Sequence, residues 1–235
     1  MMLSVSELMV AYPDKTIAVN NFNIQINDGE SAALAGANGA GKTTLMLAVA
    51  GVLPLEKGKI EVDGISLEKK TLDQVRRRVG LVFQNPDDQL FMASIYDDVA
   101  FGPRSYGLPE ETVNELTDQA LADMGISHLR GRSSLKLSGG EKRLAAIATV
   151  LSMRPSILLF DEPTAFLDLK ARRNLIRLLK SIPQAKLIAS HDLTFLEEVC
   201  GRAVLMKDGT VFADGKITEL FTNKKLMEDC DLEAL

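Results

Sequence analysis

The chain has 235 residues, of which 46% are hydrophobic and 25% are charged, and its formal net charge is −5. This is the composition of a globular protein that can bury a sizeable core, as one large domain or a domain with a subdomain. The acidic balance argues against nucleic acid as a partner, because phosphate backbones require clustered Lys and Arg. The longest apolar stretches, Leu45–Leu53 and Leu144–Met153, are too short to span a bilayer. Any membrane role is therefore expected to depend on a partner.

Strand and helix patterns alternate along much of the chain. Residues 1 to about 30 and Lys59–Asp63 have the pattern of a strand-rich edge. Apolar runs without alternation, typical of strands buried on both faces, follow at Ala32–Ala35, Leu81–Phe83, Ile157–Phe160, Leu187–Ala189 and Val204–Met206. Residues 85–152 contain no convincing strand and carry helical patterns, such as Pro109–Met124 and Gly140–Met153. The order predicts an α/β fold with a mostly parallel sheet core, an antiparallel β edge and an inserted helical subdomain.

The same patterns set the expected boundaries within a single domain over residues 1–235. The core is expected over about 1–84 and 154–223, and the helical subdomain over about 85–153. Residues 224–235 form a short, charged C-terminal tail, which we expect to be helical or frayed.

A phosphate-binding motif lies near the N-terminus. Gly36–Thr44 (GANGAGKTT) matches GxxxxGK[ST], follows a strand-like run and precedes a helix-like run, which is the context that the motif requires. Its glycines let backbone N–H groups point at phosphate oxygens, Lys42 can reach the β- and γ-phosphates, and the Thr43 hydroxyl can bind Mg²⁺. The residues expected to contact the nucleotide here are Gly36, Asn38, Gly39, Ala40, Gly41, Lys42, Thr43 and Thr44.

Two carboxylates follow a buried strand later in the chain. Asp161 ends the run Ile157–Phe160 at the position where phosphoryl-transfer ATPases hold Mg²⁺, and the adjacent Glu162 could polarise the attacking water. The pair is a weak signal alone and a strong one together with the phosphate-binding motif. If Glu162 were only a surface residue, the protein would bind ATP without hydrolysing it.

With these motifs in place, the chain resembles the ATP-binding cassette (ABC) family, a branch of the P-loop NTPases with a RecA-like core. Leu137–Glu141 (LSGGE) is similar to the LSGGQ signature of that family, with Glu in place of Gln. The resemblance implies a head-to-tail dimer, either a homodimer or a heterodimer with a similar ATPase. In that dimer Ser138, Gly139, Gly140 and Glu141 of one subunit would contact the ATP held by the other. The departure at Glu141 places an acidic group near a negative ligand.

Further positions match the family in order. Tyr12 resembles the aromatic residue that stacks on adenine, although a surface tyrosine at a strand end is a real alternative. Gln84 resembles the Q-loop glutamine that senses Mg²⁺, and Ala165–Asp168 the D-loop, which places Asp168 at the dimer interface. His191 resembles the switch histidine that contacts the γ-phosphate. The resemblance thus implies ATP and Mg²⁺ as ligands, with Glu162, His191 and Gln84 as catalytic residues and Thr43, Gln84 and Asp161 at the metal.

The Q-loop region narrows the resemblance. Gln84–Phe91 and Asp98–Pro103 are similar to the ATPases of energy-coupling factor (ECF) importers, in which Gln89 would be a second typical glutamine. Gln84 and Gln89 would then couple to an integral membrane protein, which works with a substrate-binding membrane subunit. The compact length resembles the cobalt/nickel type (CbiO or NikO). This implies a peripheral position on the cytoplasmic face of the cell membrane.

Three alternatives remain open. The first is an ATPase of a vitamin importer of the same kind. The second is a soluble ABC ATPase of an assembly complex, for example in iron–sulfur cluster assembly, against which the stretch 85–103 argues. The third is a nucleotide-binding module without catalysis, which the presence of Lys42, Asp161, Glu162 and His191 disfavours.

Overall fold

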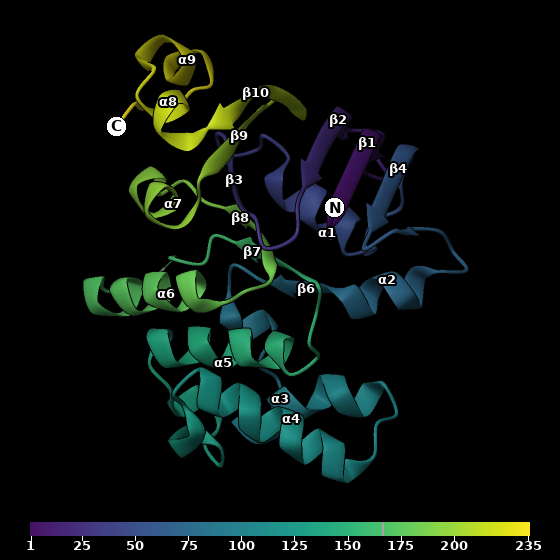
Figure 1. Ribbon diagram of the computed structural model, residues 1–235, viewed down its shortest axis with the longest axis vertical. Helices are drawn as coiled ribbons and strands as arrows, with labels where there is room; N and C mark the ends of the chain where they lie inside the picture. Colours follow the sequence, from purple (N-terminus) through teal and green to yellow (C-terminus); the bar gives the residue numbers. More distant parts are fainter. Residues whose placement is uncertain (166) are drawn as a thin grey trace. The chain divides into compact units, whose positions relative to one another are not determined.

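The computed structural model describes residues 1–165 and 167–235 (Figure 1). The chain divides into two compact units, each formed by separate stretches of sequence. Unit 1 comprises residues 1–81, 156–162 and 183–235, and unit 2 comprises residues 82–155 and 163–182. The core, subdomain and tail boundaries expected from the sequence stay a prediction.

Two sheets carry the strands. The strands are β1 (Leu3–Ala11), β2 (Ile17–Ile26), β3 (Ser31–Ala35), β4 (Lys57–Val62), β5 (Ile65–Ser66), β6 (Val79–Val82), β7 (Ile157–Asp161), β8 (Ala185–Ala189), β9 (Arg202–Lys207) and β10 (Thr210–Lys216). The larger sheet has the order β10-β9-β3-β8-β7-β6, and the smaller one has the order β2-β1-β4-β5. Strand β3 pairs in parallel with β8 and β9, and β7 with β8, whereas the pairs of the smaller sheet are antiparallel. The expected α/β fold with a parallel core and an antiparallel edge is confirmed.

Burial explains why these segments form central or edge strands. Every residue of β7 and β8 is buried, and in β3 only the first residue is partly exposed, as in strands covered on both faces. Strand β2 instead alternates, with buried side chains such as Phe22, Ile24 and Ile26 separated by exposed ones. One apolar core in unit 1 joins both sheets through residues such as Leu8 of β1, Leu34 of β3 and Leu45 of α1, each fully buried. Each such side chain contributes about 1.5–3 kcal/mol through burial.

Unit 1 also holds five helices. They are α1 (Lys42–Val49), α2 (Leu72–Arg78), α7 (Leu193–Val199), α8 (Ile217–Phe221) and α9 (Lys224–Asp229). Helix α9 begins at an Asn223 cap, whose side chain accepts a hydrogen bond from the Leu226 N–H at 3.2 Å. The Leu235 N–H donates to the Phe221 carbonyl at 2.9 Å, so the charged tail folds back on α8.

In its described residues, unit 2 consists of helices and the loops between them, with no strand apart from the end of β6. It contains α3 (Ile95–Ser105), α4 (Glu110–Asp123), α5 (Gly139–Leu151), α6 (Leu169–Ser181) and the short 3-10 helices η1 (Pro86–Asp88), η2 (Ser127–Leu129) and η3 (Ser134–Lys136). Helices α3, α4 and α5 pack on one another. Helix α6 buries Leu175, Ile176 and Leu179, spaced as one face of a helix.

Two expected boundaries shift. Strand β6 covers Val79–Val82 rather than 81–83, because the chain becomes extended immediately after α2, with Val79 at φ −106° and ψ 120°. Gln84 therefore lies in the following loop. Helix α5 covers Gly139–Leu151 rather than 140–153. It starts at Gly139 because the Ser138 side chain caps its first turn.

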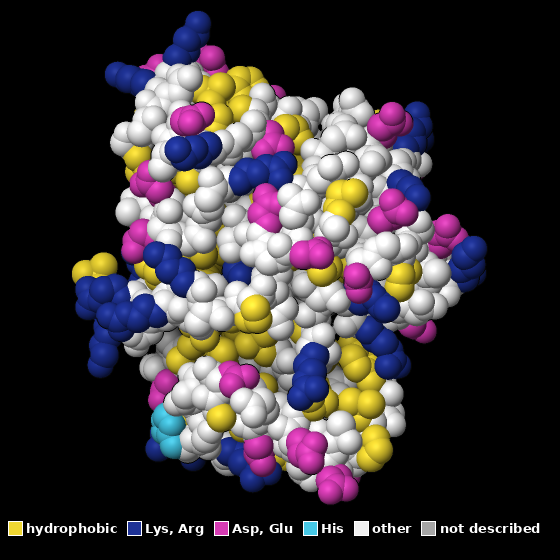
Figure 2. Space-filling model, viewed as in Figure 1, with side chains coloured by type: hydrophobic (Ala, Val, Ile, Leu, Met, Phe, Trp, Pro, Cys, Tyr) yellow, Lys and Arg dark blue, Asp and Glu magenta, His cyan; other side chains and the backbone are white. Residues whose placement is uncertain are grey.

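Charged side chains of both signs are interspersed over the face drawn in Figure 2. In unit 1, Arg202 pairs with Asp214 at 2.6 Å and with Glu30 at 3.0 Å. These partly exposed ion pairs connect the start of β9 to β10 and to the turn before β3.

Candidate functional site

The loop between β3 and α1 depends on glycines at closely packed positions. Gly41 has φ +104°, and a Cβ there would lie 2.3 Å from the Ala18 carbonyl oxygen. A Cβ on Gly36 would lie 2.3 Å from the Met206 carbonyl oxygen. Gly39 has φ +83°, which also favours glycine. The motif is therefore fitted between β2 and the end of β9.

The outer turn of the same loop is more open. Asn38 and Gly39 are exposed, whereas Ala40 is buried and its N–H donates to the Ala37 carbonyl at 3.2 Å. The outer turn lines a polar pocket of about 170 Å³ together with the tail residue Asp231.

Lys42 is the first residue of α1 and is 7% exposed. Its ammonium group donates to the carbonyl oxygens of Gly36 at 2.7 Å and Ala37 at 3.1 Å, so the side chain folds back along the loop. Burial lowers the pKa of Lys42, while the carboxylates of Glu162 and Asp161 act in the opposite direction. The buried Lys42 ammonium group and the backbone N–H groups of the loop together form a suitable binding site for an anion.

Thr43 and Asp161 come from distant parts of the sequence and meet. The Thr43 hydroxyl donates to Asp161 Oδ2 at 2.8 Å, and Asp161, at the end of β7, is 6% exposed. An alcohol and a carboxylate are hard oxygen ligands of the kind that Mg²⁺ takes beside phosphate oxygens. The donor set therefore fits a magnesium nucleotide.

Glu162 is held in an uncommon conformation directly after β7. Its φ is +45°, which few non-glycine residues adopt, and its side chain is buried. The carboxylate oxygen Oε2 accepts hydrogen bonds from the Ser190 hydroxyl at 3.0 Å and from the backbone N–H of His191 at 3.3 Å. The same oxygen lies 2.8 Å from the ring nitrogen Nδ1 of His191. The structure thus brings Glu162 and His191 together, with His191 otherwise exposed. Ser190 was not identified from the sequence, since a lone serine after a strand carries no signal.

Tyr12 and Thr44 also meet, since the two hydroxyls lie 2.8 Å apart. The Tyr12 side chain remains 40% exposed and can accept a stacking partner on its ring.

One supporting residue of the phosphate-binding loop was missed. The Gly209 N–H donates to the Ala40 carbonyl at 3.1 Å, and the Gly209 carbonyl accepts from the Asn20 N–H at 2.9 Å. The Asp208–Gly209 dipeptide is a hairpin-turn signal, which could have located the turn but not its contact with the loop.

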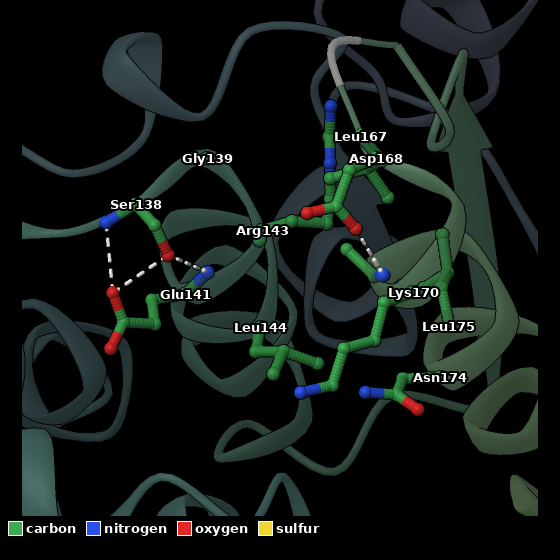
Figure 3. Close-up of a pocket in the computed structure, with 12 residues that line it drawn as sticks. Ser138, Gly139, Glu141, Arg143, Leu144, Leu167, Asp168, Lys170, Asn174 and Leu175 are labelled. Atoms are coloured by element: carbon green, nitrogen blue, oxygen red, sulfur yellow. Dashed lines mark hydrogen bonds between the residues drawn. The ribbon is translucent and has the colours of Figure 1, made fainter.

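The signature segment lies in unit 2, at the start of α5. The Ser138 hydroxyl donates to Glu141 Oε2 at 2.7 Å, and the Ser138 N–H donates to the same oxygen at 2.8 Å (Figure 3). The Glu141 N–H approaches the Ser138 oxygen at 3.4 Å, which completes a capping box. The two hydrogen bonds from Ser138 lower the pKa of Glu141, and the nearby Arg132 acts in the same direction. The pattern S-x-x-E was a sequence signal for this cap.

A pocket of about 440 Å³ in unit 2 extends from this helix start to α6. Ser138, Gly139 and Lys170 are among the residues that line it (Figure 3). Asp168 caps α6 by accepting from the Ala171 N–H at 2.7 Å. The predicted D-loop covers 165–168, of which residue 166 lies outside the described residues.

The two glutamines of the Q-loop region differ in their surroundings. Gln84 is exposed, and its backbone carbonyl accepts from Arg143 at 2.6 Å. The Gln89 amide donates to the Ala146 carbonyl at 2.8 Å and to the Thr149 hydroxyl at 2.7 Å, so it is turned onto α5. Arg143, whose side chain is 1% exposed, was missed by the sequence analysis, because an arginine within a helix usually lies on a solvated face.

The predicted site residues thus form two groups. Unit 1 holds the loop, Tyr12, Asp161, Glu162 and His191, and unit 2 holds the signature, Asp168, Gln84 and Gln89. Among residues 1–165 and 167–235, no helix is both long enough and apolar enough to cross a bilayer.

Comparisons with known proteins agree on one family. Residues 19–165 match the family described as ABC transporter. A protein of Geobacter sulfurreducens named as an ABC transporter ATP-binding protein is 46% identical over 98% of this chain and 93% of its own. The energy-coupling factor transporter ATP-binding protein EcfA of Methanothermobacter thermautotrophicus is 38% identical over 98% of this chain and 76% of its own. The solved structure of cbiO1 from Clostridium perfringens, part of the ABC transporter complex cbiONQ, has a TM-score of 0.86 and 38% identity, covering 97% of this chain and 93% of that one.

Proposed function

This chain belongs to the ABC transporter family as an ATP-binding ATPase subunit, and we propose that it powers an ECF-type importer for cobalt or nickel ions. The observation that carries the proposed chemistry is the cluster in unit 1, where Thr43 meets Asp161 and Glu162 meets His191. The likeness to cbiO1, part of the ABC transporter complex cbiONQ, over nearly the whole of both chains supports a role in a complex of this kind, and the cargo is proposed from the resemblance of the sequence to the cobalt/nickel type.

In the proposed mechanism the loop Gly36–Thr44 binds the phosphates of ATP. Its N–H groups and the Lys42 ammonium would replace the water that solvates these oxygens. Thr43 and Asp161 would hold Mg²⁺, which when bound neutralises charge on the β- and γ-phosphates. Tyr12 would stack on adenine.

Glu162 is the proposed general base. The hydrogen bonds from Ser190 and His191 end on Oε2, so Oε1 can take a proton from water as the water oxygen attacks the γ-phosphorus. The bond from the γ-phosphorus to the bridging oxygen then breaks, and ADP leaves with the electron pair. With Nδ1 of His191 donating to Glu162, donation from Nε2 to the γ-phosphate would require a ring that carries a proton on both nitrogens.

A dimer is the proposed working form. The ATP bound by one subunit would be covered by Ser138–Glu141 of the other, with Asp168 at the interface. Gln84 would sense the metal, and Gln84 and Gln89 would pass the closure to an integral membrane coupling protein. A substrate-binding membrane subunit would select the ion, and the ATPase would lie on the cytoplasmic face of the membrane.

Replacing Glu162 by Gln tests the chemistry. We expect the variant to bind ATP as tightly as the wild type and to lose turnover, because the amide cannot accept the proton. Unchanged turnover would remove Glu162 from the mechanism. Equal loss of ATP binding would instead assign it to nucleotide binding.

Purification of the tagged chain from solubilised membranes tests the transport role. We expect one coupling protein and one small polytopic subunit, and uptake of cobalt or nickel by the reconstituted complex. Uptake of a vitamin alone would replace the proposed cargo, whereas recovery of soluble partners alone would favour an assembly ATPase.

A further inference from the structure

Glu141 occupies both hydrogen-bond donors of the signature serine. The Ser138 hydroxyl and N–H both end on one carboxylate oxygen, at 2.7 and 2.8 Å. A phosphate group arriving at this helix start would need the same hydroxyl. It would therefore have to compete with a carboxylate that is already bound.

The carboxylate also fills the electrostatic role of an incoming anion. Helix α5 has 13 residues, and its N-terminal N–H groups carry a partial positive charge that favours one negative group. Glu141 supplies that group from within the helix. A second anion then meets a helix end that is partly neutralised, and it meets the charge of Glu141 as well.

The approach to the helix start is otherwise open. Gly139 lines the pocket of about 440 Å³ together with Ser138 and Lys170 (Figure 3). The guanidinium group of Arg132 acts on Glu141 and stabilises its ionised form. The obstacle to an anion is thus the charge and the hydrogen bonds of Glu141 rather than lack of space.

We propose that Glu141 is a positioning residue that holds Ser138 away from the partner-bound ATP and so weakens ATP-dependent closure of the dimer. This inference rests on the proposed function of the signature segment. Glu141 should therefore raise the KM for ATP, so that half-maximal ATPase activity requires a higher ATP concentration.

The test is Glu141→Gln in the full chain, measured by steady-state ATP hydrolysis. Glutamine can close the same capping box and is neutral, so the start of α5 should stay folded while a weaker, uncharged acceptor holds the Ser138 hydroxyl. We expect the KM for ATP to fall about three- to tenfold, with kcat changed less than about twofold, as for removal of one charge near a helix end. The matched control is Glu111→Gln, which removes one exposed charge from the first turn of α4 in the same unit.

Ionic strength separates this role from a purely structural one. Salt screens the repulsion between the carboxylate and the phosphate. The ratio of the wild-type KM to the variant KM should therefore fall toward one as the salt concentration is raised from about 0.05 to about 0.5 M. An unchanged or higher KM for Glu141→Gln, or a ratio that does not vary with salt, would overturn the inference. A wild-type chain that hydrolyses no ATP would instead overturn the proposed function.

Discussion

Replacing Gly209 by Ala, with Gly64→Ala as its match, measures how strongly the β9–β10 turn supports the phosphate-binding loop. Both glycines occupy the second position of an Asp-Gly hairpin turn, with φ +77° and +73°, after aspartates at φ +47° and +51°. They differ in surroundings. A Cβ at Gly64 would meet nothing within 4 Å, whereas at Gly209 it would lie 2.8 Å from the Ala18 carbonyl oxygen and 3.1 Å from the Val19 Cα.

The matched pair isolates the contact energy. Both substitutions carry the same left-handed penalty of about 1–2 kcal/mol, which cancels in the comparison. Gly209→Ala adds a clash with backbone, which overpacking studies place at about 1–3 kcal/mol. It also strains the Gly209–Ala40 hydrogen bond, worth about 0.5–1.5 kcal/mol. Gly209→Ala should therefore destabilise unit 1 by about 1.5–4.5 kcal/mol more than Gly64→Ala.

Two measurements decide the matter. Urea unfolding followed by circular dichroism gives the stability difference, since the chain has no tryptophan for fluorescence. Titration with ATP should show about tenfold weaker binding for Gly209→Ala, because about 1.4 kcal/mol of loop displacement corresponds to that factor, and wild-type binding for Gly64→Ala. Equal stabilities and equal ATP affinities of the two variants would refute the argument that the turn positions the loop.

Three further predictions concern side chains away from the phosphate-binding loop. Arg143→Met should lower the unfolding free energy of unit 2 by about 2–4 kcal/mol, because the carbonyls of Phe83 and Gln84 lose charge-assisted hydrogen bonds of 2.7 and 2.6 Å. An unchanged melting temperature would contradict this prediction. Burial raises the pKa of Asp98 above its ordinary 3.8, so the folded chain keeps that proton to higher pH than the unfolded chain. The unfolding free energy of the wild type relative to Asp98→Asn should therefore fall as pH rises through the folded pKa, and a pH-independent difference would refute it. Burial raises the pKa of Cys200 to about 12 and also raises that of Cys230, so a thiol reagent at about pH 8 should label neither cysteine until the chain is unfolded.

The local parts of the site could be predicted from the sequence, since short motifs encode them. The glycine spacing in Gly36–Thr44 requires one tight turn between a strand and a helix, and β3 and α1 flank it. The order of apolar runs likewise predicts buried parallel strands. The S-x-x-E spacing of Ser138 and Glu141 is also a sequence signal for a capping box, whereas the family resemblance marks Glu141 only as a departure from the usual glutamine.

The long-range contacts could not be predicted, since they depend on which segments become neighbours. Nothing in the sequence around Ser190 indicates that its hydroxyl binds Glu162, 28 positions earlier. The direction of the Gln89 side chain was equally hidden, because an amide in a loop can face a partner protein or, as here, the backbone of a helix in its own unit. Spatial neighbours set these roles, and a single sequence does not record them.

The pairing of β3 has a consequence for how the chain is made. On one side Ala33 pairs with Ile188 and on the other with Ala203, both of which leave the ribosome long after it does. Until then the strand that precedes the phosphate-binding loop has apolar side chains and two edges of unpaired backbone N–H and C=O groups, of the kind that pair with other chains. The central strand of the larger sheet can therefore complete its pairing only after nearly the whole chain has been synthesised.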